Sequence, residues 1–436
     1  MQKIISHNFL KICTSFICFL PLAMLTGPAI PDFIVIVTGI YFLFYLFSEK
    51  ENIISSNKFF IYFLFFYFFL IISSILSVDS WLSLKFTIPY IRFILLAFLI
   101  SYLIKNYKKK FYLYFFISCF LSTTMLFIDS IFEFSVGKNL LGFPSIVKGR
   151  VGSLFGDELI LGSYILKISP LFLTSLFFIE ISNVKKKILF FILLFIFFII
   201  IFISGDRAPL FLFCLFLLTL FFLLKPFRKG FLLTLLLIIT ISIAAMSFNK
   251  NLYNRLVTQT INEIGFGEKN YNQKILRLTE DAEKLTFYKK KKYLFSAQHH
   301  NYFLTGVNIF KDNLFFGAGP KLFFQLSSQK KYAIDNFSQI THPHNFYIQL
   351  LAETGLIGFC IVFFFFLYLV KKIFDLKNAC EKTFDQSNKI IIGISIAGLI
   401  FHLWPIITTG SFFTNYNCIM IYMCVGFFLG QTKDAS

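Results

Sequence analysis

The feature that most constrains the fold of this chain is a series of apolar runs, each long enough to cross a membrane as a helix. A transmembrane helix needs about 20 mostly apolar residues, and the 436-residue chain is 57% hydrophobic. The runs cover residues 9–26, 30–47, 58–77, 86–104, 111–131, 158–181, 188–204, 208–224, 230–248, 346–370, 389–407 and 411–430. A water-soluble domain does not have this pattern. We therefore predict an all-α polytopic membrane protein with about twelve transmembrane helices.

The apolar runs divide the chain into two membrane regions that flank one long polar segment. We expect transmembrane helices 1 to 9 in residues 1–248, a large helical loop in residues 249–345, and helices 10 to 12 in residues 346–436. No internal repeat and no matching pair of broken helices is visible in the two halves, which weakens the case for a transporter built from inverted repeats.

The long loop contains two stretches with helical patterns. Residues 277–296 predict a charged helix. Within residues 300–311, Phe303, Val307 and Phe310 share one helical face, which predicts a helix that lies on the membrane surface. The glycine- and proline-containing residues 317–320 then end it.

Basic residues are distributed unevenly among the short loops, and this distribution predicts the orientation. With twelve helices, the basic loops all lie on one side of the membrane. They are residues 105–110, 185–187, 225–229 and 371–382, whereas the opposite loops at residues 26–32 and 408–411 are nearly free of Lys and Arg. Basic short loops face the cytoplasm. We therefore expect both termini in the cytoplasm and the long loop on the outer, periplasmic side.

The net charge of +19 has two sources. Part of it lies in the cytoplasmic loops, and the rest lies in the outer loop and at its membrane edges, where anionic lipid headgroups or a diphosphate would bind. The outer location excludes nucleic acid as a partner of that face. Seven of the eight cysteines fall inside predicted helices and there is no CxxC motif, so we interpret them as packing residues.

His344 is the first candidate for chemistry. Asn345 is a suitable N-cap for an apolar helix that begins at Phe346, which places His344 at a helix N-terminus. The field there attracts anions and keeps an imidazole neutral and able to accept a proton. Asn345, Gln349 and Glu353 form a polar stripe that should face protein or a water-filled cavity. The alternative is that His344 only anchors the helix among the headgroups.

Several arginines are candidates for binding an anionic substrate. Arg207 lies in a very short outer connection between two apolar runs, where its guanidinium can hold phosphate through two parallel hydrogen bonds. The alternatives for Arg207 are an interfacial anchor or a partner of Asp206. Arg92 lies inside a predicted helix, where arginine is costly and usually functional. Arg150 and Arg277 lie in loops, where solvated charge is the alternative.

The histidines outside the His344 motif are His299, His300 and His342. They raise the question of a metal site with His344, but no carboxylate at ligand spacing supports one. We therefore expect no metal and no cofactor.

Three segments of the second half resemble the O-antigen ligase and polymerase superfamily of bacterial membrane glycosyltransferases, which are of the GT-C type. Its members have a histidine followed by Asn, Ser or Gln, nine residues and Gly-x-x-Gly; here His344-Asn345 is followed by residues 346–354, Gly355 and Gly358. The segment KDNLFFGAGPKLFF resembles the glycine-containing stretch that precedes this histidine, and SGDRAPLF resembles the family's arginine-containing turn. The ligase-like motif region spans about residues 200–370.

The resemblance implies an inverting, metal-independent transfer of a glycan from undecaprenyl diphosphate to an acceptor. It implies that His344 activates the acceptor hydroxyl or helps hold the donor, and that Arg207 contacts the diphosphate. Family members often carry an arginine before the glycine-containing stretch; here Arg277 is the nearest upstream arginine and His300 stands near that point. The candidate substrate-binding residues are therefore Arg207, Asn345, Arg277, His300, Arg150 and Arg92. The identity of the second phosphate-binding residue stays open.

Several functions share this donor. The leading hypothesis is an O-antigen ligase of the inner membrane that transfers the glycan to lipid A-core, with membrane lipids around it. Its rivals are a polymerase that extends a growing glycan and a transferase that modifies a protein hydroxyl. A flippase or transporter of lipid-linked sugars is the alternative outside enzymes; it would require several ionisable residues deep in the helices and an internal repeat.

Overall fold

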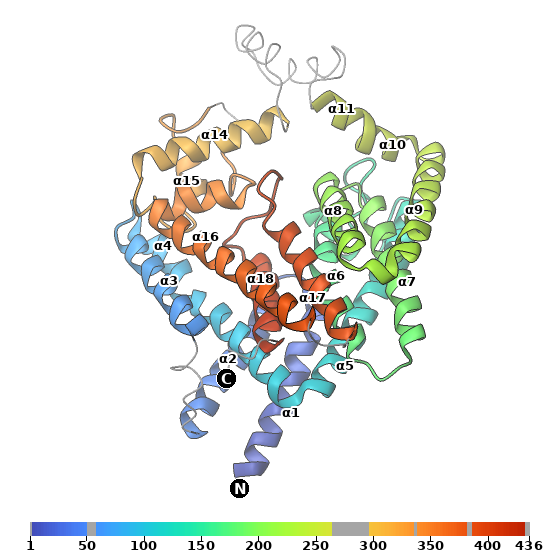
Figure 1. Cartoon of the computed structure of the whole chain (residues 1–436). Coiled ribbons are helices and arrows are strands. Elements are labelled where there is room, and N and C mark those ends of the chain that lie inside the picture. The colour runs from blue at the N-terminus through green and yellow to red at the C-terminus, as the bar shows by residue number, and fades with distance from the viewer. Residues whose placement is uncertain (1, 50–57, 264–295, 335–337, 382–385, 432–436) are drawn as a thin grey trace.

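Figure 1 shows the computed structural model of the chain, which describes residues 2–49, 58–263, 296–334, 338–381 and 386–431. In this part of the chain, helices joined by turns and short loops make up the protein. Seven of its helices are long and apolar enough to cross a membrane, and three shorter apolar helices accompany them. The prediction of an all-α polytopic membrane protein is confirmed.

Each apolar run found in the sequence falls on a helix. The helices are α1 (Gln2–Ala23), α2 (Ala29–Glu49), α3 (Lys58–Ile75), α4 (Ser80–Thr87), α5 (Ile91–Val136), α6 (Leu161–Phe177), α7 (Asn183–Ile203), α8 (Arg207–Leu223), α9 (Arg228–Phe248), α10 (Lys250–Tyr253), α11 (Gln259–Glu263), α14 (Ala297–Asp312), α15 (Phe323–Ser327), α16 (Phe346–Glu381), α17 (Gln386–His402) and α18 (Asn415–Gln431). Two predicted runs share α5, which bends at Tyr107, where φ is −137°. The division into nine and three crossing helices stays a prediction.

Helix α5 lies at the centre of the bundle. It packs against α1, α2, α6 and α18, and aromatic rings fill much of the space between them. The rings of Phe115 and Phe427 are 4.8 Å apart, and those of Tyr112 and Phe178 are 3.9 Å apart. Burial of such large apolar side chains against one another fixes how these helices pack.

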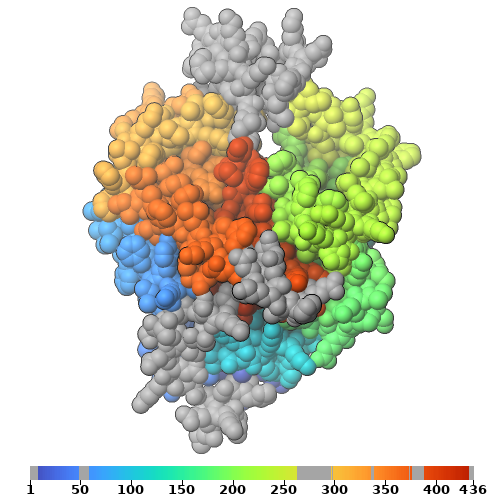
Figure 2. Space-filling model, in the orientation of Figure 1, coloured from blue at the N-terminus to red at the C-terminus, as the bar shows by residue number. Residues whose placement is uncertain are grey.

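Two groups of helices stand on either side of a central loop. Helices α14, α15 and α16 lie on one side and α8 to α11 on the other, and the loop of residues 403–414 rises between them (Figure 1). The space-filling view shows the same division on the surface, with this red segment between the orange and the green groups (Figure 2). Both chain ends lie in the lower half of Figure 1, away from α11 and α14.

Helix α16 is broken at Gly355, where φ is 65° and ψ is −169°. Residues 314–319 lie against the break. The N–H groups of Leu356 and Ala318 donate to the carbonyls of Leu314 and Ala352 at 2.7 and 2.9 Å, so the neighbouring segment supplies partners for backbone groups at the break. The glycine-containing stretch and the Gly-x-x-Gly motif therefore meet backbone to backbone.

The predicted surface helix of residues 300–311 lies within α14, which packs against α15 and α16. The face that carries Phe303 is half-buried, and its position at a membrane surface stays a prediction. Gly306 approaches α16 so closely that a Cβ there would lie 2.5 Å from the Ile348 side chain. Almost all of the charged helix predicted at residues 277–296 lies outside the described residues.

Candidate functional site

His344 lies in the turn that leads into α16, in an unusual backbone conformation. Its φ is 55°, a left-handed value that costs a residue with a Cβ about 1–2 kcal/mol. The Thr409 N–H donates to the His344 carbonyl at 2.7 Å. The Asn345 side-chain oxygen accepts from the N–H groups of Tyr347 and Ile348 at 3.0 and 3.2 Å. The predicted Asn345 cap is confirmed, and the turn holds His344 in place.

Three imidazole rings and one tyrosine ring meet at this helix end. The ring centroid of His344 is 4.2 Å from that of His342, 5.2 Å from that of His299 and 5.8 Å from that of Tyr302. His299 and Tyr302 come from the start of α14, where the Ser296 hydroxyl and His299 Nδ1 are 2.7 Å apart. The sequence placed His299 near the motif but gave no signal for Tyr302.

The surroundings keep these rings neutral. Burial, together with the nearby His344, lowers the pKa of His299 to about 4 and that of His342 to about 3. Burial also lowers the pKa of His344, against a hydrogen bond to the Thr409 backbone that raises it. An imidazole with a lowered pKa is deprotonated at neutral pH and can accept a proton.

His342 and His344 line a cavity of about 990 Å³. Five parts of the chain form its walls: residues 24–31, 154–167, 206–212, 341–346 and 401–419, together with Phe86 and Lys321. Within the described structure, His342 Nε2, Thr409 Oγ1 and Tyr416 OH are buried without a hydrogen-bond partner. Buried polar atoms normally have partners, so these three suit a substrate with many hydroxyl groups.

Arg207 begins α8, directly after the tight turn of residues 204–206. The turn is held from outside, because Arg150 forms an ion pair with Asp206 and also donates to the Leu159 carbonyl at 3.0 Å. Asp206 is therefore the partner of Arg150. The charge of Arg207 contributes to the lowered pKa of His299, after burial and His344, so Arg207 lies near the histidine cluster. Its contact with substrate stays a prediction, as does that of Arg150.

The remaining predicted residues are Arg92, His300 and Arg277. Arg92 lies in the first turn of α5. It donates to Asp32, Pro89 and Asn415 at 2.9, 2.9 and 3.1 Å and lines a smaller pocket beside the main cavity. His300 lies in α14, next to the clustered His299 along the chain. Arg277 falls outside the described residues, so its place is not part of this structure.

The predicted polar stripe of α16 faces protein and joins two loops. Asn345 donates to the carbonyls of Pro405 and Ile407 at 2.9 and 3.4 Å. Gln349 accepts from the Phe412 N–H at 2.7 Å and donates to Glu353 at 2.9 Å. All three stripe side chains are buried. The stripe therefore ties the loop of residues 403–414 to α16, and the Asn345 amide has protein partners before any substrate binds.

Glu353, the last member of the stripe, holds a different segment, the backbone of residues 319–323. Its carboxylate accepts from the Phe323 N–H at 3.1 Å, and its carbonyl accepts from the Gly319 N–H at 3.0 Å. These bonds fix the backbone on both sides of Lys321, which lines the cavity.

Two lysines of the cavity are absent from the predicted site residues. Lys321 has a φ of 67°, and Lys167 of α6 is in contact with the Asn417 side-chain oxygen. The sequence carried a signal for Lys321, which directly follows Gly319-Pro320 in the glycine-containing stretch. Lys167 could be noticed only as a charge inside an apolar run.

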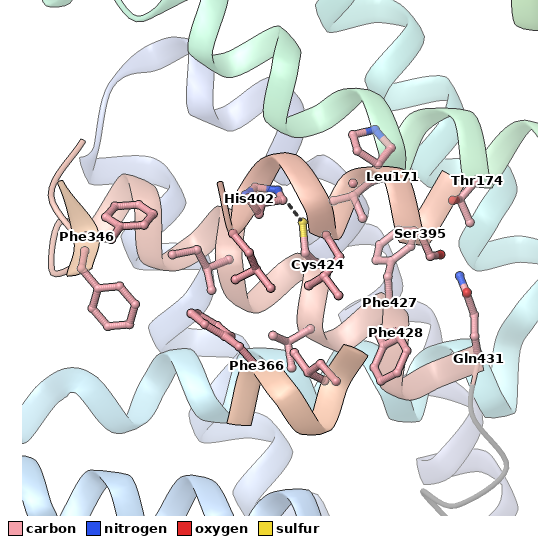
Figure 3. Close-up of a pocket in the computed structure, with 18 residues that line it drawn as sticks. Leu171, Thr174, Phe346, Phe366, Ser395, His402, Cys424, Phe427, Phe428 and Gln431 are labelled. Atoms are coloured by element: carbon pink, nitrogen blue, oxygen red, sulfur yellow. Dashed lines mark hydrogen bonds between the residues drawn. The ribbon is translucent and has the colours of Figure 1, made fainter. Parts of the chain in front are cut away.

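A second, smaller cavity of about 120 Å³ lies between α6, α16, α17 and α18 (Figure 3). Its lining is mostly apolar, with Phe366, Phe427 and Phe428 among the labelled side chains. His402 points toward Cys424, and its Nε2 lies 3.7 Å from the sulfur. Phe346 and His402 line both cavities, so the apolar cavity adjoins the polar one.

Part of the chain matches a known protein family. Residues 191–363 match the family model described as O-antigen ligase. No curated protein matches the chain. The matched segment contains both Arg207 and His344, and it runs from α7 into α16. Through this segment, which covers less than half of the chain, the protein is similar to the O-antigen ligase family.

Proposed function

We propose that the protein transfers a glycan from undecaprenyl diphosphate to a hydroxyl group of lipid A-core, at the periplasmic face of the inner membrane. The family implies a lipid-linked glycan, an acceptor and membrane lipids as partners. One observation carries the proposal. His344, with a lowered pKa, lies on the wall of a cavity of about 990 Å³ inside the matched segment.

In the proposed reaction, His344 acts as the general base. Its neutral ring accepts the proton of the acceptor hydroxyl while the oxygen attacks the anomeric carbon of the donor sugar. The bond from that carbon to the diphosphate oxygen breaks, and undecaprenyl diphosphate leaves with the bonding electrons. A single displacement of this kind inverts the anomeric configuration and requires no metal ion.

Arg207 is the residue proposed to bind the leaving diphosphate. Negative charge grows on that group as the sugar bond breaks, and a guanidinium held beside it stabilises the transition state. The turn that carries Arg207 is tied down by the ion pair between Arg150 and Asp206. We therefore assign Arg150 a positioning role through this turn.

The apolar cavity supports a lipid-linked donor. Its lining of phenylalanine and leucine side chains suits part of a hydrocarbon chain. Because Phe346 and His402 line both cavities, a lipid that occupied the apolar cavity would have its polar end near His344.

The experiment that tests the function is a lipopolysaccharide gel of two host strains that carry this gene. One host lacks its own ligase and the other lacks its own polymerase. We expect long-chain lipopolysaccharide in the ligase-deficient host only, and its loss with His344→Ala at unchanged protein abundance. Restoration only in the polymerase-deficient host would show that the protein is a polymerase and not a ligase. Normal transfer by His344→Ala would show that His344 is not the general base.

The orientation is proposed together with the function. Both chain ends lie away from α11 and α14 (Figure 1), as expected if the termini are cytoplasmic and the segment around residues 249–345 is periplasmic. Alkaline phosphatase fused after residue 263 should be active, and the same fusion after residue 431 should be inactive. The reverse pattern would place the cavity on the cytoplasmic side.

A further inference from the structure

A second polar pocket adjoins the main cavity on the side of α4 and α5. Its volume is about 180 Å³, several times the ~30 Å³ that one water molecule occupies in the liquid. Lys85, Arg92 and Lys321 all line it. Lys321 and Asn415 also line the main cavity, so the two spaces are neighbours that share side chains.

The charges of this pocket are only partly neutralised by protein. Arg92 forms an ion pair with Asp32 at 2.9 Å. Neither Lys85 nor Lys321 forms an ion pair with a carboxylate in the part of the chain that the structure describes. The three lining cations and the Asp32 carboxylate sum to two positive charges, close to what a phosphomonoester of about −1.5 to −2 would neutralise. The Glu353 carboxyl interacts electrostatically with Lys321 but does not line the pocket.

Lys321 is held at the boundary of the two spaces. Its φ of 67° is unusual for a residue with a side chain, and conformations of this kind persist where the surroundings fix them, often at functional sites. Here the carboxylate and the carbonyl of Glu353 hold the backbone on either side. The fold therefore pays in backbone strain to place this ammonium group at the pocket.

The pocket lies where α3, α4 and α5 meet. Helix α4 connects α3 to α5, and its Trp81 is 82% exposed while the following Ile88 is 56% exposed. Exposed tryptophan beside apolar side chains is typical of the membrane interface, at the level of the lipid headgroups. A ligand of this pocket would thus be a phosphate carried by a membrane-anchored molecule.

We propose that Lys85, Arg92 and Lys321 form a binding site for a phosphate group of the membrane-anchored acceptor. The inference rests on the proposed function, in which Arg207 takes the diphosphate of the donor. The rings of His299, His344 and His342 form a row, with His344 in the middle. The charge of Arg207 lowers the pKa of His299, at one end of this row. The charge of Lys321 lowers the pKa of His342, at the other end. The two anions would then flank His344 instead of competing for one site.

Binding is tested first, without catalysis. The full-length protein carrying both Lys85→Gln and Lys321→Gln is compared with wild type by native mass spectrometry in nanodiscs that contain phosphatidic acid. The double variant should retain about tenfold less phosphatidic acid, since each lost charge-assisted hydrogen bond weakens binding. Lys311→Gln with Lys330→Gln, two exposed lysines outside both pockets, is the matched control. Equal retention by all three proteins would refute the site.

Kinetics with purified enzyme then identify the source of the phosphate. The double variant should raise the KM for the acceptor several-fold more than the KM for the donor, and dephosphorylated acceptor should abolish the difference from wild type. A rise confined to the donor KM would make the pocket a diphosphate site and refute the acceptor assignment. Absence of transfer by wild type would reject the proposed function and, with it, the acceptor, while the binding result would still decide whether the pocket binds phosphate.

Discussion

Replacement of Gly355 by alanine should destabilise the protein and reduce transfer together. At φ 65° and ψ −169°, a residue with a Cβ is strained by about 1–3 kcal/mol. The new Cβ would also lie 2.4 Å from the Phe315 carbonyl oxygen, and overpacking of this kind costs a further ~1–3 kcal/mol. We expect a total of about 2–6 kcal/mol, and the segment that leads to Lys321 should shift with it.

Gly156 offers a matched control for this variant. Its φ of 57° and ψ of −122° give similar strain, but a Cβ there would have no atom within 4 Å. Thermal unfolding in detergent should show a much larger loss for Gly355→Ala than for Gly156→Ala. Equal losses would mean that strain alone matters at Gly355, and that the close approach of residues 314–319 to α16 does not.

Three further predictions concern the site itself. Because the pKa of His344 is lowered from 6.5, protonation should remove the base only in more acidic solution; a kcat/KM profile whose acid limb has its midpoint above pH 6.5 would contradict this. Arg207→Lys should reduce kcat about tenfold or more, since a point charge does not replace the planar fork, and transfer at the wild-type rate would leave Arg207 as an interfacial anchor. Asn345→Ala should lower stability by about 1–2 kcal/mol through the lost cap, measured as a lower unfolding midpoint, and an unchanged midpoint would show that the turn holds without the cap.

The helices could be predicted from the sequence because apolar length is a local property. The same holds for the Asn345 cap, whose hydrogen bonds lie within one turn of the chain. Contacts between distant segments could not be predicted in this way. The sequence predicts that Glu353 belongs to a polar stripe facing protein or a water-filled cavity, but it cannot show that Glu353 holds the backbone around Lys321. The spacing of residues along the chain also could not predict that Tyr302 lies beside His344, because that contact depends on how α14 packs on α16.

The walls of the cavity explain why the match to the O-antigen ligase model leaves the acceptor open. The matched segment, residues 191–363, supplies Arg207 and His344, which the proposed mechanism needs for any acceptor. Much of the cavity wall, which includes His344 but not Arg207, comes from outside this segment, from residues 24–31, 154–167 and 401–419. Side chains that touch only the acceptor are free to differ while the donor and the base stay the same. The choice between ligase and polymerase should therefore depend on the walls that lie outside the matched segment. Exchanging the loop of residues 403–414 with that of a polymerase should change which acceptor is used while the donor stays the same.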